Sequence, residues 1–199
     1  MEKKEIRVEY AETLLAKLNI SISVKGREKL NNDGPYLLVS NHRSVIDPLV
    51  IENILKETTI FGHWIAKKEL YNSFFFGMFV RNTGSILIDR SAKQMTGLFA
   101  EIKNNVSNGE SIFVFPEGTR NKGDGVIGRF KKGSDIIARK SKLDILPVYI
   151  ETNTNDVLMA SITKNEKNLV IDVEIGDVIP YEKKPKSLEE SYKSMFGLT

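Results

Sequence analysis

A histidine and an aspartate stand five residues apart, at His42 and Asp47. Imidazole titrates near neutral pH, so histidine is the usual general base, and a carboxylate on its far nitrogen fixes the tautomer and stabilises the imidazolium. The pair can meet if His42 lies in a strand-to-helix turn and Asp47 in the first helical turn. Ser44 or Asp47 could cap that helix, and Pro48 is tolerated in its first turn. The alternative is that Asp47 only caps a helix and His42 is a buried polar residue.

The sequence offers no protein nucleophile to accompany such a base. It contains no Gly-x-Ser-x-Gly elbow and no cysteine. A base without a protein nucleophile indicates that the base activates a hydroxyl group of the substrate.

A second polar cluster, Phe115–Arg120, follows the apolar run Ser111–Val114. Gly118 permits a tight turn, and the guanidinium of Arg120 offers a rigid fork of donors that suits phosphate. Glu117 could accept from a substrate hydroxyl or hold Arg120 in place. The alternative is a surface turn with an ordinary ion pair, which contributes little. We favour a functional role because the turn follows a buried strand and opens a basic patch.

Further cations could bind an anion near these two clusters. Arg90 ends the apolar run Gly84–Arg90, and Lys67 follows another apolar stretch, although a surface strand end and a solvated lysine are the alternatives. A basic patch attracts phosphates on nucleic acid, lipid headgroups or a small substrate, whereas a charge run alone usually marks a solvated face. The members of this patch are Arg120, Lys122, Arg129, Lys131 and Lys132.

Two other patterns carry less weight. The run Gly123–Gly128 matches the dinucleotide pattern G-x-G-x-x-G, but it follows a polar loop and not a strand. His63 stands beside Trp64 in an apolar stretch and is interpreted as structural. Two histidines without paired spacing, in a chain that lacks cysteine, argue against a zinc site, so we expect no metal.

Composition limits the possible classes of protein. The 199 residues suffice for one domain, and 41% apolar and 28% charged residues are ordinary for a globular protein. The absence of cysteine excludes disulfides, thiolate metal sites and a cysteine nucleophile, and it fits a reducing compartment. A net charge of only +3, with no stacking-aromatic pattern among the basic residues, argues against a nucleic-acid partner.

The spacing of apolar residues predicts alternating helices and strands. This alternation predicts a single α/β domain with a mostly parallel central sheet flanked by helices, in which the last two strands could be antiparallel. We expect an amphipathic helix within residues 1–19, with possible membrane contact, and the main domain over 20–199. Helices are expected at 5–18, 48–56, 91–106, 131–140 and 188–196, a helix or loop at 68–81, and strands at 20–24, 36–40, 59–66, 85–89, 111–115, 145–150, 157–163 and 168–175.

We predict neither a signal peptide nor a spanning helix. Met1–Glu5 leads into mixed charged and apolar residues with no apolar core of a leader. The longest aromatic and apolar run, Phe74–Val80, is far shorter than the roughly 20 residues that a spanning helix needs. We therefore expect the chain to be soluble or to lie on a membrane surface.

Four blocks of the sequence resemble, in order, the motifs of the glycerolipid acyltransferases, and are most similar to those of the bacterial 1-acylglycerol-3-phosphate (lysophosphatidic acid) acyltransferases. One block alone is a modest signal, but four in order are specific. The resemblance covers roughly residues 20–150 and implies an α/β acyltransferase domain at a membrane surface, with a long acyl tunnel or groove. The blocks are Asn41-His42-x4-Asp47, Gly84–Arg90, Phe115–Arg120 and Ile145–Val148.

The resemblance also implies roles for single residues. His42 would deprotonate the acceptor hydroxyl, Asp47 would orient it, and the neighbouring Asn41 would belong to the substrate-binding set. Pro147 would handle the acyl donor or shape the site. The residues implied in binding the acceptor and its phosphate are Glu117, Gly118, Thr119, Arg120, Arg90 and, less directly, Lys67.

The reaction implied by the resemblance is transfer of a fatty acyl group to the sn-2 hydroxyl of lysophosphatidic acid, giving phosphatidic acid in phospholipid biosynthesis. The donor would be an acyl carrier protein or coenzyme A thioester, with no permanently bound cofactor. Two alternatives stay open: an acyltransferase for another acceptor, such as glycerol 3-phosphate or a different lysophospholipid, and a non-catalytic phospholipid-binding module.

A lipid substrate implies a peripheral position at the cytoplasmic face of the membrane. Many relatives begin with longer hydrophobic N-terminal helices, whereas this sequence has only the amphipathic segment 5–18. Either apolar set expected to touch lipid could instead be core. These sets are Val8, Leu14, Leu15 and Leu18, and Phe74, Phe75, Phe76, Met78 and Phe79.

Overall fold

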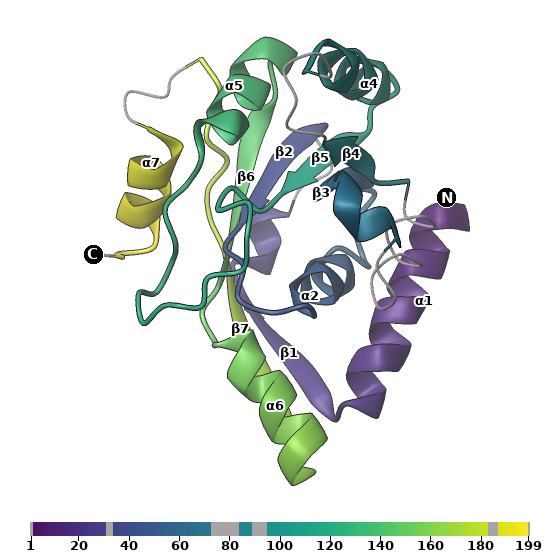
Figure 1. The fold of residues 1–199 in the computed structure, drawn as a ribbon, viewed down its shortest axis with the longest axis vertical. Helices are drawn as coiled ribbons and strands as arrows, with labels where there is room; N and C mark the ends of the chain where they lie inside the picture. The colour runs from purple at the N-terminus through teal and green to yellow at the C-terminus, as the bar shows by residue number, and fades with distance from the viewer. Residues whose placement is uncertain (1, 31–33, 73–83, 89–94, 183–186, 199) are drawn as a thin grey trace.

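A seven-stranded sheet forms the centre of the molecule (Figure 1). The computed structural model describes residues 2–30, 34–72, 84–88, 95–182 and 187–198. The strands are β1 (Ile20–Lys25), β2 (Tyr36–Ser40), β3 (Gly62–Lys67), β4 (Ile86–Ile88), β5 (Ser111–Val114), β6 (Asp144–Ile150) and β7 (Leu169–Ile175). The helices are α1 (Glu2–Lys17), α2 (Asp47–Ile54), α4 (Met95–Ser107), α5 (Lys132–Ser141), α6 (Thr154–Lys164) and α7 (Leu188–Met195).

The strands follow the order β1-β7-β6-β2-β5-β3-β4. All neighbouring pairs are parallel except β6 and β7, which are antiparallel. The predicted α/β domain with a mostly parallel sheet is therefore confirmed. Because β2, β3, β5 and β6 run in the same direction, their carboxyl ends meet at one edge of the sheet, which is where open α/β folds bind ligands.

Helices cover both faces of the sheet, with α1 and α2 on one side and α5 and α7 on the other (Figure 1). The five residues of β2 are all buried and alternate between the two faces. Leu38 packs in a core that includes side chains of α1, α2 and α6, while Leu37 and Val39 pack in a second core with those of α4, α5 and α7. This burial holds the end of β2, and the loop that follows it, in place.

One predicted element is wrong: residues 157–163 form most of α6 and not a strand. Asn153 caps this helix by accepting from the backbone N–H of Asn155, and Asn165 ends it with a left-handed backbone at a φ of 53°. Val157 and Ser161, four residues apart, are buried on one helical face. A short apolar run alone does not distinguish a strand from a buried helix. The strand predicted at 168–175 is confirmed as β7.

The apolar face of α1 packs against the protein. Leu15 is buried in the core beside α2, so the prediction that it contacts a membrane is wrong. Leu14 and Leu18 are partly buried and pack against the same core, and their predicted membrane contact stays a prediction. Val8 is half-buried. The second predicted set, within 74–79, lies outside the described residues. In the part of the chain that the structure describes, no helix combines the length and apolarity needed to cross a bilayer.

A buried ion pair fastens α1 to α2 and β3. The side chains of Arg7 and Glu52 are only 4% and 3% exposed. Arg7 donates to Glu52 and, at 2.7 Å, to the carbonyl of Gly62, and its guanidinium lies 5.0 Å from the ring centre of Phe61. The indole N–H of Trp64 donates to the same oxygen of Glu52 at 2.7 Å. The N-terminal helix is thus linked through one carboxylate to a residue of β3.

We predict that Arg7→Met strongly destabilises the protein, because it leaves Glu52 as a buried charge without its cation. Breaking such a pair from one side typically costs about 3–5 kcal/mol, which urea unfolding would measure. Lys56→Met is the matched control, because Lys56, two residues after the end of α2, pairs with Glu12 of α1 on the surface. The control should cost less than about 1 kcal/mol. Equal effects of the two substitutions would contradict this account.

Candidate active site

His42 and Asp47 meet in the turn between β2 and α2. His42 Nδ1 lies 2.7 Å from Asp47 Oδ2, and the imidazole is 17% exposed whereas the carboxylate is 1% exposed. An ionised carboxylate only accepts, so the pair places the proton on Nδ1. The lone pair on Nε2 is then left for a substrate.

The carboxylate of Asp47 is held on all sides by donors. Oδ2 also accepts from the backbone N–H groups of Arg43 at 2.7 Å and Ser44 at 2.8 Å, and Oδ1 accepts from the hydroxyl of Thr154 at 2.5 Å. The N-cap of α2 is Ile46, so neither Ser44 nor Asp47 is the capping residue that the sequence allowed. The carboxylate of Asp47 instead accepts hydrogen bonds from the imidazole of His42 and from the backbone N–H groups of Arg43 and Ser44.

Aromatic rings support the imidazole. The ring of Phe115 stacks on His42 with centroids 4.0 Å apart and planes 9° apart, and Trp64 stacks on Phe115 at 4.9 Å. Trp64, the last ring of this stack, is held in place because its indole N–H donates to the buried Glu52. The orientation of His42 is therefore set by a carboxylate at one ring edge and by a ring against its face.

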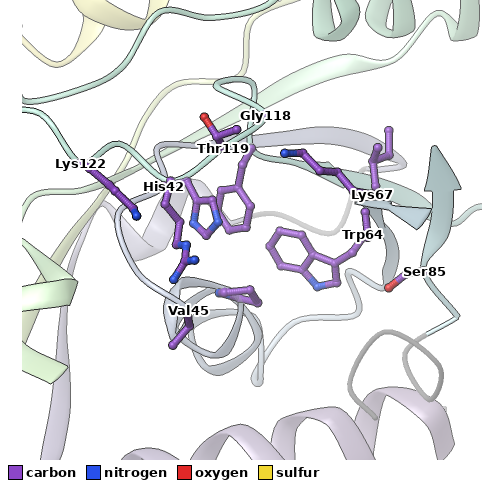
Figure 2. Close-up of a pocket in the computed structure, with 13 residues that line it drawn as sticks. His42, Val45, Trp64, Lys67, Ser85, Gly118, Thr119 and Lys122 are labelled. Atoms are coloured by element: carbon purple, nitrogen blue, oxygen red, sulfur yellow. The ribbon is translucent and has the colours of Figure 1, made fainter. Parts of the chain in front are cut away.

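His42 opens into a cavity of about 330 Å³ (Figure 2). One part of the lining is apolar, with Val45 and Trp64 among its residues, and another carries cations. Figure 2 shows Lys67 and Lys122 on opposite sides of His42 in that view. None of the described residues that line the cavity carries a carboxylate. The full lining is His42, Val45, Pro48, Trp64, Ile65, Ala66, Lys67, Ser85, Phe115, Gly118, Thr119, Arg120 and Lys122.

Glu117 joins the two loops that form the site. Its Oε1 accepts from the backbone N–H of His42 at 2.7 Å, and its Oε2 accepts from that of Gly128 at 2.8 Å. A side chain at position 128 would collide with Oε2, which accounts for the last glycine of the G-x-G-x-x-G run. Burial raises the pKa of Glu117, and the two backbone N–H donors oppose that rise. Glu117 therefore holds the backbone at His42 and the backbone at Gly128 in fixed positions.

Not every predicted site residue reaches the cavity. Lys67, Gly118, Thr119 and Arg120 line it with His42. Arg90 lies outside the described residues. Sequence reasoning missed Lys122 in the lining, although its place in the basic patch was a signal.

Asn41 lies behind the cavity and continues the pairing of β2 with β6. Its amide donates to the carbonyl of Ile150 at 2.9 Å and accepts from the N–H of Ile150 at 2.8 Å. Pro147 is buried within β6, opposite Val39 of β2. Both residues shape the strands that carry the site. His63 lies elsewhere, between the carbonyl of Gly84 and the carboxylate of Glu110.

Comparison with known proteins identifies the family. A family model described as Acyltransferase matches residues 21–151. The chain belongs to the acyltransferase family.

Named acyltransferases share both sequence and fold with the chain. A 1-acyl-sn-glycerol-3-phosphate acyltransferase of Helicobacter pylori is 38% identical over 59% of the chain and 48% of the relative, and one of Escherichia coli is 33% identical over 62% and 50%. The chain thus spans about half the length of these curated relatives. The crystal structure of the 1-acyl-sn-glycerophosphate (LPA) acyltransferase PlsC from Thermotoga maritima matches with a TM-score of 0.72 at 25% identity, over 96% of the chain and 74% of that structure.

We predict that Glu117→Gln lowers stability by about 1–3 kcal/mol, because an amide nitrogen cannot accept from the second backbone N–H. The raised pKa adds a pH dependence. Because the pKa of Glu117 is higher in the folded than in the unfolded protein, protonation of Glu117 stabilises the folded state. This contribution is complete at pH values below the unfolded pKa of about 4.3, and it is lost as pH rises through the folded pKa. The advantage of the wild type over the variant should therefore shrink as pH rises above the unfolded pKa of about 4.3.

Urea unfolding at a series of pH values would measure this advantage. Glu166→Gln is the control, because Glu166 is an exposed glutamate paired with Lys164. Its difference from the wild type should stay small at every pH. An advantage of Glu117 that grows with pH would contradict the burial argument.

Proposed function

We propose that the protein transfers a fatty acyl group from a thioester to the sn-2 hydroxyl of 1-acylglycerol 3-phosphate, giving phosphatidic acid. The observation that carries the proposal is His42 with its Nδ1 bound to Asp47, at the wall of a cavity that holds cations and apolar side chains. The names of the relatives support the same reaction.

The chemistry follows from the free nitrogen of His42. Nε2 takes the proton of the acceptor hydroxyl as its oxygen attacks the thioester carbonyl. The carbon–sulfur bond then breaks, and the imidazolium returns the proton to the leaving thiolate. The products are an ester and a thiol. Asp47 keeps Nδ1 protonated and stabilises the imidazolium that forms between the two steps.

The cations of the cavity suit the phosphate of the acceptor. Arg120 can bind two phosphate oxygens at once, while Lys67 and Lys122 act as point charges. With no carboxylate among the described lining residues, an anion meets no repulsion there. Arg90 is a further proposed phosphate contact.

The apolar lining suits an acyl chain. Val45, Pro48, Trp64 and Phe115 border the cavity next to His42, so a thioester carbonyl at Nε2 could place its chain against them. Acyl carrier protein and coenzyme A present the same thioester, and either is a candidate donor. No bound cofactor is required for this reaction.

The decisive experiment measures release of free thiol from an acyl thioester, with lysophosphatidic acid and vesicles present. We expect release that requires the acceptor and falls by about 10²- to 10⁴-fold in His42→Ala, because the general base is lost. His63→Ala is the matched control, since His63 is the only other histidine of the chain and lies outside the cavity. It should keep wild-type rates.

The other outcomes separate the alternatives. Release that ignores the acceptor would indicate a thioesterase. No release from either carrier, with lipid binding intact in both proteins, would favour a phospholipid-binding module. A panel of acceptors would distinguish lysophosphatidic acid from glycerol 3-phosphate and other lysophospholipids, and equal turnover of a phosphate-free acceptor would contradict the role of Arg120.

The same proposal places the protein at the cytoplasmic face of the membrane as a peripheral protein. With Leu15 buried and Leu14 partly buried, the outer side of α1 carries the exposed apolar residues Ile6 and Tyr10, which are 57% and 48% exposed. Lys3 is exposed on the same helix. We propose this outer side of α1 as a membrane contact.

We predict that the purified protein sediments with anionic vesicles and that the double variant Ile6→Glu, Tyr10→Glu sediments less. The substitutions remove apolar contact area and add negative charge. Met159→Glu with Ile162→Glu is the matched control, because these exposed residues lie on α6. Equal loss in both double variants would refute a specific role for α1.

A further inference from the structure

Asp47 binds His42 through one oxygen, and its other oxygen has a partner from a distant part of the chain. Oδ1 accepts from the hydroxyl of Thr154, which stands 107 residues later in the sequence. Thr154 is the first residue of α6 and lies beyond residue 151, where the match to the family ends.

The contact is fully buried. Asp47 is 0% exposed and Thr154 is 1% exposed. Among the described residues, the Thr154 hydroxyl is the only hydrogen-bond donor to Oδ1, whereas Oδ2 has three donors. A buried carboxylate oxygen without a donor is costly, so this hydroxyl stabilises the ionised carboxylate.

The start of α6 is itself held in position. Asn41 pairs with Ile150 at the end of β6, four residues before Thr154. The connecting residues bind Asp172 of β7, because Glu151 donates to its carbonyl and Thr152 accepts from its backbone N–H. The hydroxyl of Thr154 is therefore presented by a fixed backbone.

Helix geometry adds to this contact. Asn153 caps α6, so Thr154 occupies the first turn of an eleven-residue helix. The first turn carries the positive end of the helix dipole, which favours an anion such as the Asp47 carboxylate. The dipole and the hydroxyl thus act on the same oxygen.

We propose that Thr154 is a positioning residue for the His42–Asp47 pair. By fixing Oδ1, it fixes the rotation of the carboxylate about the Cβ–Cγ bond, and this rotation directs Oδ2 at His42 Nδ1. Without the hydroxyl, Oδ2 keeps its two backbone donors but Oδ1 loses its described donor. The carboxylate is then held through one oxygen alone, and the orientation of His42 is enforced less firmly. This role rests on the proposed function of His42 as the general base.

The test compares Thr154→Val with Thr154→Ser. Valine keeps the shape of the side chain but lacks the donor, whereas serine keeps the donor. We expect kcat of Thr154→Val to fall about tenfold, with KM for lysophosphatidic acid and for the thioester changed less than about twofold. Thr154→Ser should restore most of kcat.

A spectroscopic readout needs no substrate. The proton on His42 Nδ1, shared with Asp47, is expected as a downfield proton NMR signal of the free protein, assigned by its loss in His42→Ala. The signal should persist in Thr154→Ser and should broaden or vanish in Thr154→Val, because a looser hydrogen bond exchanges faster with water.

Ser161→Ala is the matched control on the same helix. Its buried hydroxyl donates to the carbonyl of Leu18 at 2.7 Å, so its loss weakens the packing of α6 without touching Asp47. The control should keep both kcat and the NMR signal. A similar fall in kcat in Ser161→Ala, or wild-type kcat and signal in Thr154→Val, would overturn the proposal.

The two readouts separate this proposal from the function on which it rests. If the wild type transfers no acyl group but its Nδ1 signal is lost in Thr154→Val and kept in Thr154→Ser, the positioning role stands and the proposed function fails. If the wild type is active and Thr154→Ser is as impaired as Thr154→Val, the positioning role fails and the function stands.

Discussion

The negative charge on Asp47 is completely removed from solvent, and the surrounding structure is arranged to satisfy it. Four donors reach its two oxygens: the imidazole of His42, two backbone N–H groups of the same turn, and the Thr154 hydroxyl. A buried charge is tolerated only when it is paired and hydrogen-bonded. The β2–α2 turn and the start of α6 must therefore come together, and the parallel sheet holds their strands side by side.

Glu117, in the loop after β5, is a second buried carboxylate whose oxygens accept from hydrogen-bond donors. Glu117 accepts from the backbone of His42 and from Gly128, so the loop after β5 is attached to the loop after β2. Asn41 attaches the end of β2 to β6 in the same way. The sequence analysis assigned these two polar side chains to substrate binding, but in the structure they bind backbone groups. These contacts within the protein preorganise the site.

Sequence reasoning foresaw the elements that depend on local pattern. The buried strands β2 and β5, each followed by a polar cluster, were readable because an apolar run ends abruptly at residues of unusual chemistry. Residues of α6 were predicted as a strand because their apolar pattern is as compatible with a strand as with a helix. The capping residues Asn153 and Asn165, which begin and end the helix, favour the helix. Thr154 was missed for a different reason: its importance comes from a contact across 107 residues, which no local pattern records.

The arrangement of charge also explains which ligand the site can accept. The carboxylates of Asp47 and Glu117 are buried behind His42, and backbone donors offset their charge. Lys67, Arg120 and Lys122 instead border the cavity. The cavity is therefore positive while the base at its wall is anchored to a negative group. In the proposed reaction, an anionic acceptor would be attracted to the cations without meeting the carboxylates, and the imidazolium formed during proton transfer would have Asp47 beside it. Separating the two charge sets by burial would let one small cavity bind a phosphate and still keep a working base, as the proposed function requires.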